Sequence, residues 1–296
     1  MSKSILITGC SSGIGYDAAT TLHARGWKVF AGCRQAQDRD RLNKKGIESL
    51  PLDYADERSI AAAVAHVREC TAGRLDALFN NGAYAIPGAV EDVPRDALRA
   101  IFEVNVFGQF DLIRQCLPLL NAADSGRVVN CSSVLGFVSI PYRGAYCATK
   151  YAMEALTDAM RREHKDSKLQ FVLIEPGPID TRIRENAVPH FEQWIDWQSS
   201  RLRSHYENVF RPRLYRTDDA KDRFELPPSA VTKKLIHALE IRRPRPRYYV
   251  TAPTWFASAV ARLLPTRWQD AVLGLTDSPR CAAVPASPRS ADLAAG

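Results

Sequence analysis

Short apolar runs alternate with amphipathic segments along most of the chain. The runs have the length and the Ile, Val, Leu and Phe content of buried parallel strands, and they cover residues 4–8, 28–33, 47–52, 75–79, 127–131, 169–174 and 248–250. The segments between them repeat their apolar positions with a helical period, most clearly over residues 16–25, 57–70, 95–120 and 229–241. This alternation predicts an α/β fold with a parallel sheet.

The same pattern favours one large domain over residues 1–251. Residues 182–221 have poor periodicity and mix aromatic side chains with arginines, so we expect a lid over a ligand, with a subunit contact as the alternative. Residues 252–277 are expected to form a helical extension. Its amphipathic helix 255–264 is predicted to pack on the core or on a second subunit rather than on a membrane surface. Pro, Ser, Ala and Arg dominate residues 278–296, which predicts a disordered tail.

The composition is that of an ordinary globular protein, with 46% hydrophobic and 25% charged residues among 296. The net charge of +7 is not concentrated in one tract, so a phosphate-bearing small molecule is a simpler partner than nucleic acid. The seven cysteines are scattered and lack zinc spacing, which predicts reduced thiols in a cytoplasmic protein and no metal site. The N-terminal apolar run is too short for a signal peptide, and no run has the length of a transmembrane helix.

A hydroxyl, a phenol and an ammonium group are predicted to meet near the end of the strand 127–131. Tyr146 and Lys150 are four residues apart, so a helix from Gly144 places both on one face, one turn apart. An adjacent ammonium stabilises a phenolate and lowers its pKa, which makes Tyr146 usable as a general acid or base. Ser133 follows the strand, and its hydroxyl is expected at the carboxyl edge of the sheet, where open α/β sheets bind ligands. Taken alone, the Tyr-x-x-x-Lys spacing also fits an ordinary amphipathic helix.

A glycine-rich turn joins the first strand to the first helix. This is the context of a dinucleotide loop, because glycines let the backbone approach a pyrophosphate and free N–H groups at a helix start attract its charge. The spacing Gly-x-x-x-Gly-x-Gly differs from the commoner Gly-x-Gly-x-x-Gly, and a turn that serves only helix packing is the alternative. The residues of this turn predicted to contact the cofactor are Gly9, Ser11, Ser12, Gly13, Ile14 and Gly15.

The ends of the next three strands supply further predicted contacts to the dinucleotide, and the first of them bears on its identity. Arg34 follows the second strand, where a carboxylate would hold a ribose 2′-hydroxyl and an arginine suits a 2′-phosphate. Because no carboxylate appears before Asp38, NADP(H) is preferred over NAD(H); the alternative is that Arg34 is a solvated loop charge. Asp53 is expected either to contact the adenine or to cap the next helix. Asn80 and Gly82 are predicted to form a turn close to the cofactor, or simply a turn.

Two residues are poorly suited to the long helical pattern 95–120. Asn105 and Gly108 are both unfavourable in a helix interior, and such local misfits tend to mark function. Asn105 is expected to disturb the helix and to hold a water on the far side of Lys150. A buried hydrogen bond to a neighbouring backbone group is the competing explanation.

In order and spacing, these residues resemble the short-chain dehydrogenase/reductase family. The resemblance covers about residues 3–251 and is carried by Thr8-Gly9-x-x-x-Gly13-x-Gly15, Asn80-Asn81, Asn105, Ser133, Tyr146-x-x-x-Lys150 and Pro176-Gly177. The chain looks most like bacterial NADP-dependent aldehyde reductases, a subgroup akin to retinol and hydroxysteroid dehydrogenases. One departure is Gly82-Ala83, where the family usually has Ala-Gly, so the glycine that approaches the cofactor comes one place earlier.

The resemblance implies a Rossmann-type, doubly wound sheet of about seven parallel strands in a single domain. It also implies roles: Ser133 polarises a substrate carbonyl, and Tyr146 protonates its oxygen as hydride arrives from the nicotinamide. Lys150 lowers the pKa of Tyr146 and holds the nicotinamide ribose, while Asn105 keeps a water in the proton relay. Tyr146 and Lys150 therefore contact the cofactor as well, and further contacts are assigned to the turn after the sixth strand, namely Pro176, Gly177, Ile179 and Thr181.

The predicted function is hydride transfer between NADP(H) and an apolar aldehyde or ketone, or the matching alcohol. Aromatic residues in the predicted lid, with Tyr84 and Tyr142 near the expected site, favour an apolar substrate. The alternative of another class is a non-catalytic NADP-binding sensor or scaffold, which has no need of Ser133, Tyr146 and Lys150. Nucleic-acid binding rests on net charge alone. The family resemblance also implies a homodimer or homotetramer.

Overall fold

The structure, a computed structural model, describes residues 2–215 and 224–274. A seven-stranded sheet runs through it, with all strands parallel in the order β3-β2-β1-β4-β5-β6-β7. The strands are β1 (Ser4–Thr8), β2 (Lys28–Cys33), β3 (Glu48–Pro51), β4 (Ala77–Asn80), β5 (Arg127–Cys131), β6 (Gln170–Glu175) and β7 (Arg247–Tyr249). Each lies within one or two residues of its predicted run, so the predicted doubly wound parallel sheet is confirmed.

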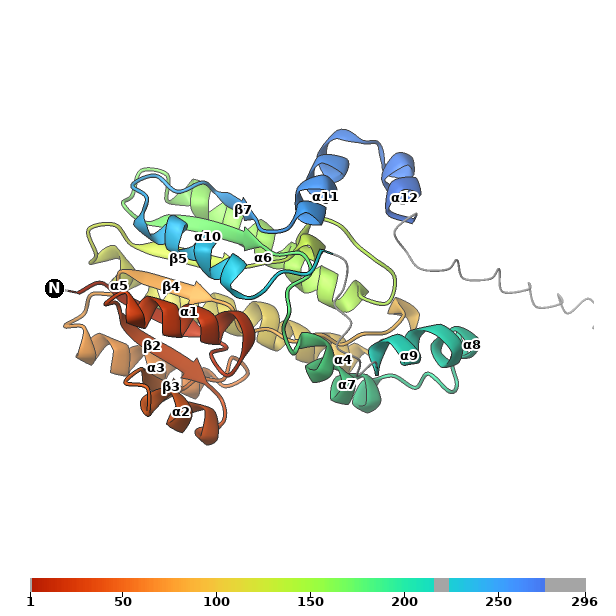
Figure 1. The fold of residues 1–296 in the computed structure, drawn as a ribbon, viewed down its shortest axis with the longest axis horizontal. Coiled ribbons are helices and arrows are strands. Elements are labelled where there is room, and N and C mark those ends of the chain that lie inside the picture. Colours follow the sequence, from red (N-terminus) through yellow and green to blue (C-terminus); the bar gives the residue numbers. More distant parts are fainter. Residues whose placement is uncertain (1, 216–223, 275–296) are drawn as a thin grey trace, which may run out of the picture.

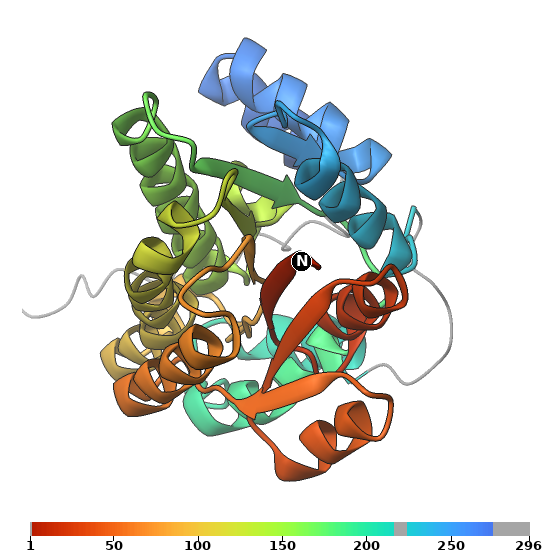
Figure 2. The ribbon, with the colours of Figure 1, turned by 90° about the vertical axis from the view of Figure 1, so that its left-hand side faces the viewer.

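Helices cover both faces of the sheet (Figures 1 and 2). One face carries α1 (Gly13–Ala24), α2 (Ala36–Asn43) and α10 (Ser229–Glu240), and the other carries α3 (Glu57–Cys70), α5 (Gln109–Asn121) and α6 (Gly144–Glu163). Alternate residues of β1 enter the two cores: Ile5 and Ile7 pack in one and Leu6 in the other. Because both faces are covered, the strand reads as an unbroken apolar run.

The strand order reverses beside β1, since β2 and β3 lie on one side of it and β4 to β7 on the other. Open α/β sheets bind ligands at such a switch point, outside the carboxyl ends of the strands. The glycine-rich turn after β1 and the segment after β4 both leave the sheet here. The topology therefore brings these two predicted cofactor segments to one place.

The predicted helix over residues 95–120 is interrupted. A 3-10 turn (Val90–Asp92) precedes α4 (Arg95–Phe102), which passes into a π-helical segment over Glu103–Gly108 before α5 continues. A Cβ on Gly108 would overlap the backbone carbonyl of Tyr54, so a larger residue does not fit there. The misfits noted in the sequence, Asn105 and Gly108, therefore mark a real break in the helix, of a kind often found at functional sites.

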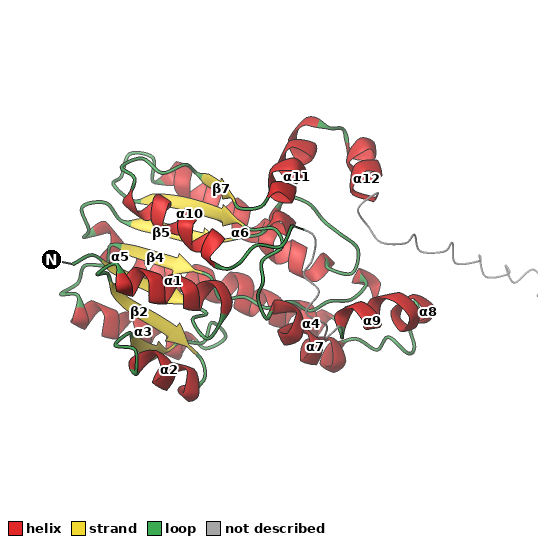
Figure 3. Ribbon diagram, viewed as in Figure 1, coloured by secondary structure: helices red, strands yellow, loops and turns green. Residues whose placement is uncertain are grey.

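The predicted lid is helical rather than irregular. It contains α7 (Ile183–Trp194), α8 (Arg203–His205), a π-helical turn (Tyr206–Phe210) and α9 (Arg211–Leu214), which lie beyond the carboxyl ends of the strands (Figures 1 and 3). The helical period is hidden because Pro189 lies inside α7 and the later helices are only three to five residues long. Phe191 and Tyr206 are fully buried in a third core, which this segment shares with residues of α4 and α6 such as Ile101 and Ala145. Residues 216–221 of the predicted lid lie outside the described residues.

The C-terminal extension consists of α11 (Ala252–Leu263) and α12 (Thr266–Gly274), which project from the body of the molecule in Figure 1. α11 begins three residues earlier than the amphipathic helix predicted over 255–264, and α12 lies within the helical extension predicted over 252–277. Thr254 is buried whereas Trp255 is 53% exposed, so α11 packs by one face only. Residues 275–277 of the extension and the predicted tail 278–296 lie outside the described residues. Within the described ranges, no helix combines the length and apolarity needed to cross a bilayer.

Candidate active site

Ser133 stands at the carboxyl end of β5, where the strand passes into a 3-10 turn (Val134–Gly136). Its hydroxyl oxygen accepts a hydrogen bond of 3.1 Å from the Leu135 N–H and so caps this turn. The turn is also held from outside, because the Val134 N–H donates to the Pro176 carbonyl at 2.8 Å. Strand, cap and neighbouring turn together fix the place of the Ser133 hydroxyl.

Helix α6 carries Tyr146 and Lys150 on one face, and both side chains are buried, at 8% and 2% exposure. The Lys150 Nζ lies 5.6 Å from the centroid of the Tyr146 ring. Tyr146 also shares a hydrogen bond with the Ser133 hydroxyl, and Lys150 donates to the Cys131 carbonyl at 2.7 Å. The structure therefore brings the hydroxyl, the phenol and the ammonium group together at the end of β5.

Burial dominates the protonation of both groups. It raises the pKa of Tyr146, and the hydrogen bond with Ser133 opposes this only in part. It lowers the pKa of Lys150, although Cys131 and, one turn further along α6, the Glu154 carboxylate both favour the charged form. The net pKa of Tyr146 is raised because the cost of burying a phenolate exceeds the stabilisation by its neighbours. The contribution of Lys150 to lowering this pKa stays a prediction.

Asn105 forms buried hydrogen bonds to the protein. Its side chain accepts from the Tyr84 N–H at 3.1 Å and donates to the Tyr84 carbonyl at 2.8 Å. Its second amide hydrogen goes to Thr149 Oγ1 at 3.2 Å. These bonds join the π-helical segment to the turn after β4 and to α6, so the competing explanation, a bond to neighbouring backbone, accounts for this residue. A part for Asn105 in a proton relay stays a prediction.

The glycines after β1 make close backbone packing possible. Gly9 and Gly13 have φ angles of 68° and 56°, in the left-handed region that favours glycine. A Cβ on Gly9 would meet the Gly82 Cα at 2.8 Å, and a Cβ on Gly15 would overlap the Gly9 carbonyl oxygen. Gly82, one place earlier than the usual glycine of the family, is therefore in direct contact with the turn after β1.

A pocket of about 210 Å³ lies along this turn at the switch point. The helix α1 starts at its edge, and no side chain caps that N-terminus, so main-chain N–H groups are available to an anion. Positive-φ glycines, these N–H groups and an arginine suit the pyrophosphate and ribose phosphate of a dinucleotide. The predicted cofactor residues that line the pocket are Gly9, Ser11, Ser12, Gly13, Ile14, Arg34, Asp53, Gly82 and Thr181.

Other predicted cofactor residues do not line the pocket, namely Gly15, Asn80, Pro176, Gly177 and Ile179. Asn80 is fully buried, where it accepts a hydrogen bond from the Tyr54 hydroxyl at 2.8 Å. A Cβ on Gly177 would overlap the Thr251 hydroxyl, so this glycine lets α11 pack against the turn after β6. These residues hold the turns in place rather than form the lining.

Ser133, Tyr146 and Lys150 lie beside the pocket rather than in its lining. The connection is Cys131, which lines the pocket and whose carbonyl accepts the hydrogen bond from Lys150. A molecule in the pocket therefore lies close to the group of three side chains at the end of β5.

The charges around Arg34 and Asp53 differ in part from the expectation. Asp38, the first carboxylate after β2, forms an ion pair with Arg41 at 3.0 Å, which leaves Arg34 as a pocket-lining cation. Asp56, not Asp53, caps α3: its Oδ1 accepts from the Arg58 N–H at 2.9 Å. The capping alternative for Asp53 is therefore wrong, and Asp53 lines the pocket.

Several residues that line the pocket are not predicted from the sequence to contact the cofactor. Tyr54 follows β3, and its hydroxyl lies 2.7 Å from Thr8 Oγ1 under the glycine turn. Arg182, Ile183 and Asn186 reach the pocket from the start of α7. The only signal for the last three was their place in the predicted lid, since no motif includes them.

Away from the pocket, the described residues bring together three side chains of types that bind metals, although no metal site is predicted. Their ligand atoms lie within 4.8 Å of one another, and they belong to Glu48 in the edge strand β3 and to His66 and Cys70 in α3. The His66 Nε2 and the Glu48 carboxylate are 2.5 Å apart and form a partly exposed hydrogen bond.

Comparison with known proteins agrees with this geometry. The family described as "short chain dehydrogenase" matches residues 3–191. "Uncharacterized oxidoreductase YbbO" of Escherichia coli is 38% identical over 273 residues, which cover 92% of this chain and 94% of that protein. Human "Retinol dehydrogenase 16" is 34% identical, covering 83% of this chain and 80% of that one. "NADPH-dependent 3-dehydrocapnine reductase" of Ornithobacterium rhinotracheale is 32% identical, covering 90% and 94%.

The family match covers more than half of the chain, and the YbbO relative matches nearly all of it. The sheet order, the glycine turn and the arrangement of Ser133, Tyr146 and Lys150 agree with that match. The chain is an oxidoreductase that belongs to the short-chain dehydrogenase/reductase family.

Proposed function

We propose that this oxidoreductase transfers hydride between NADP(H) and an apolar aldehyde or ketone, or the matching alcohol. The observation that carries the proposal is the meeting of Ser133, Tyr146 and Lys150 beside the pocket of the glycine turn. The nicotinamide supplies the hydride chemistry, and the protein supplies position and proton transfer.

Each of the three side chains has a role that its contacts support. The Ser133 hydroxyl accepts from the Leu135 N–H, which leaves its own proton to donate to a carbonyl oxygen or to Tyr146. Tyr146 keeps its proton at neutral pH because burial raises its pKa, so it enters the reaction as a general acid. Lys150 is fixed by the Cys131 carbonyl within reach of the pocket lining, where it holds the ribose next to the nicotinamide.

The preference for NADP(H) is supported by Arg34. This cation lines the pocket at the end of β2, where a 2′-phosphate is expected, and the nearest following carboxylate, Asp38, is paired with Arg41. Among the relatives, the 3-dehydrocapnine reductase is NADPH-dependent by name.

An apolar substrate is supported by the aromatic residues around the site. Tyr146 belongs to the same apolar core as the buried Phe191 and Tyr206 of the lid segment. Tyr84 lies 4.3 Å from the His190 ring, and Tyr142 lies 5.1 Å from the Phe210 ring, measured between centroids. A relative named for retinol, an apolar alcohol, fits this setting.

A panel of hydrophobic aldehydes, ketones and alcohols, run with NADP(H) and with NAD(H), tests the proposal. We expect NADPH oxidation with at least one apolar carbonyl compound and loss of this activity in Tyr146→Phe. Tyr151→Phe is the matched control, because Tyr151 is on the same helix but exposed, and it should retain activity. Full activity in a folded Tyr146→Phe contradicts the assignment. Tight NADPH binding without turnover on the whole panel favours the alternative, an NADP-binding sensor or scaffold.

We also propose that the protein forms a homodimer or homotetramer, in accord with the family resemblance. A cytoplasmic location is supported by the scattered cysteines, which are free among the described residues. Light scattering of the purified protein tests the subunit count. A monomer at micromolar concentration contradicts it.

A further inference from the structure

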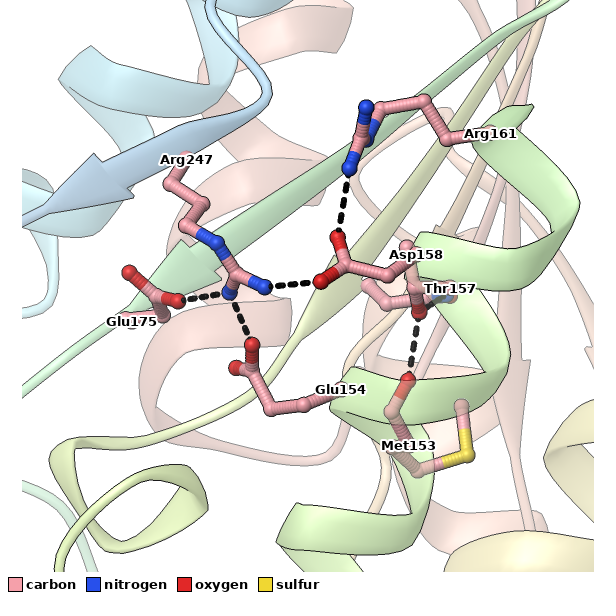
Figure 4. Close-up of polar contacts among 8 residues, drawn as sticks. Met153, Glu154, Thr157, Asp158, Arg161, Glu175 and Arg247 are labelled. Carbon is pink, nitrogen blue, oxygen red and sulfur yellow. Dashed lines mark hydrogen bonds and ion pairs between the residues drawn. The ribbon is translucent and has the colours of Figure 1, made fainter.

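Arg247 binds three carboxylates inside the protein, against α6 (Figure 4). It is the first residue of β7, and its side chain is 20% exposed. Its Nη1 donates to both Glu154 and Glu175, with a distance of 2.6 Å to the Glu175 Oε1. Its Nη2 donates to the Asp158 Oδ2, also at 2.6 Å. The cluster therefore ties β7 to the carboxyl end of β6 and to two turns of α6.

Two of these carboxylates are too close and too deep for both to be charged. Glu175 is fully buried, Glu154 is 6% exposed, and both reach the same nitrogen of Arg247. Desolvated like charges disfavour each other's ionisation. Burial and the Glu154 carboxylate accordingly raise the pKa of Glu175 to about 8. Among the described residues, the ionisable groups that face Glu175 are Glu154 from α6 and Arg247 from β7.

Asp158 is the outer member of the cluster and behaves differently. It is more exposed than Glu154, and its Oδ1 has a second partner, Arg161, at 2.9 Å. Burial acts to raise the pKa of Asp158, but Arg161 and Arg247 outweigh it and the pKa is lowered. Asp158 is therefore charged, and the proton in this cluster belongs to the inner pair.

The inner end of the cluster faces the candidate active site. Tyr146, Lys150 and Glu154 follow one another at four-residue spacing on α6, and the Glu154 carboxylate favours the charged form of Lys150. The Glu154 Oε1 and the Ser132 hydroxyl both lie within 3.1 Å of the position that a Cβ on Gly136 would take. Neither has a hydrogen-bond partner among the described residues. Buried polar atoms are normally paired. The unpaired Oε1 of Glu154 is therefore an acceptor that is still available, and it lies beside the turn that Ser133 caps.

We propose that Glu154 and Arg247 are positioning residues for the reaction, and that Glu154 and Glu175 hold one proton between them. Arg247 fixes the Glu154 carboxylate, and this carboxylate supports the positive charge of Lys150. The proton on Glu175 keeps a third negative charge out of the cluster, next to those of Glu154 and Asp158. The part concerning Lys150 rests on the proposed function, whereas the shared proton is a property of the fold alone.

Stability as a function of pH tests the shared proton, with Glu175→Gln as the variant. Glutamine imitates a protonated Glu175 at every pH. A glutamate in the unfolded chain has a pKa of about 4.3, whereas the pKa of Glu175 in the folded protein is raised to about 8. Between these values the folded state binds more protons than the unfolded state, so the wild type loses stability as the pH rises. The advantage of Glu175→Gln over the wild type, read from urea midpoints, should therefore grow up to about pH 8 and then level off.

Asp158→Asn is the matched control for this measurement. Because the pKa of Asp158 is lowered in the folded protein, its ionised form stabilises the fold at neutral pH and this contribution is lost in acid. The variant should therefore be less stable than the wild type at neutral pH, with the deficit shrinking as the pH falls. A stability difference for Glu175→Gln that stays constant over the whole pH range overturns the shared proton.

Steady-state kinetics test the positioning role, with Glu154→Gln as the variant. Glutamine keeps the size of the side chain but removes the charge that supports Lys150. We expect kcat to fall about tenfold, since a misplacement of about 1 Å can cost about a hundredfold. We also expect the alkaline limb of the kcat profile to move to lower pH, because Lys150 then loses its proton more readily, while KM for the carbonyl compound changes little. Arg247→Met should resemble Glu154→Gln, and Arg247→Lys should recover part of the loss.

Glu163→Gln is the control for the kinetic experiment, since it removes an exposed carboxylate from the last residue of the same helix, outside the cluster, and should leave kcat and its pH profile unchanged. A folded Glu154→Gln with the wild-type profile overturns the positioning role, and so does an equal shift in Glu163→Gln. If Glu154→Gln does not fold, Glu154→Asp replaces it, with a smaller shift in the same direction expected. If the wild type turns over no carbonyl compound, the proposed function and the positioning role fail together, whereas the stability curves still decide the shared proton.

Discussion

Replacing Gly15 with alanine tests whether the glycine turn depends on backbone packing. A Cβ at this position would lie 2.8 Å from the Gly9 carbonyl carbon, overlap its oxygen, and lie 2.7 Å from the Asn81 Nδ2. The Gly9 backbone cannot rotate away as a side chain can, so the turn must move. In an unhindered helix the change would gain up to about 1 kcal/mol, whereas overpacking costs about 1–3 kcal/mol. We therefore expect a net loss of up to about 2 kcal/mol in the free energy of unfolding.

The effect on cofactor binding should be larger, because the turn lines the pocket. Loss of one hydrogen bond to a charged group costs about 1.5–3 kcal/mol, which corresponds to a rise in the NADPH Kd of about ten- to a hundredfold. Fluorescence titration with NADPH gives the Kd, and urea unfolding gives the stability. Gly26→Ala is the control: its φ is 84° and its Cβ position is open, so alanine should cost stability but no affinity. An unchanged Kd in Gly15→Ala refutes the reasoning.

Two further changes have defined outcomes. Arg34→Ala should raise KM for NADPH about tenfold or more and leave KM for NADH nearly unchanged, because it removes the charge-assisted contact proposed for the 2′-phosphate. Arg25→Ala, just past the far end of α1, should change neither, and equal losses for both cofactors would contradict the role of Arg34. Tyr206→Phe removes a hydroxyl that accepts from the Ala89 N–H at 2.7 Å and donates to Asp92 at 2.8 Å, so urea unfolding should show a loss of about 1–3 kcal/mol. No loss there would mean that these buried groups find other partners.

The five inner strands could be predicted because each contributes side chains to the cores on both faces of the sheet. A strand buried on both faces appears as an uninterrupted apolar run, and β1 is an example, with Ile5 and Leu6 packing on opposite sides of the sheet. The helices of the lid could not, because their period is broken by Pro189 and by lengths of three to five residues. Their position is set by buried aromatic residues such as Tyr206, whose partners lie more than a hundred residues away in sequence.

The candidate site divides in the same way. Residues whose geometry follows from local spacing were predictable: Tyr146 and Lys150 share a helix face, and the glycines of the turn share one loop. Residues brought in by the tertiary structure were not. Arg182 reaches the pocket from the residue before α7, and Arg247 reaches Glu154 across 93 positions of sequence. The sign of the pKa shift of Tyr146 was also beyond reach, because it depends on how deeply the phenol is buried.

The protonation of Tyr146 links the fold to the direction of the proposed reaction. Burial raises its pKa, so at neutral pH the phenol holds the proton that an oxygen receiving hydride requires. Oxidation of an alcohol needs the phenolate instead, whose formation burial opposes and the charge of Lys150 favours. Burial lowers the pKa of Lys150 and so disfavours this charge, whereas Glu154 favours it. In the proposed reaction, reduction is therefore favoured by the raised pKa of the buried Tyr146. The pH at which oxidation begins is expected to depend on how far Glu154 and Arg247 raise the pKa of Lys150.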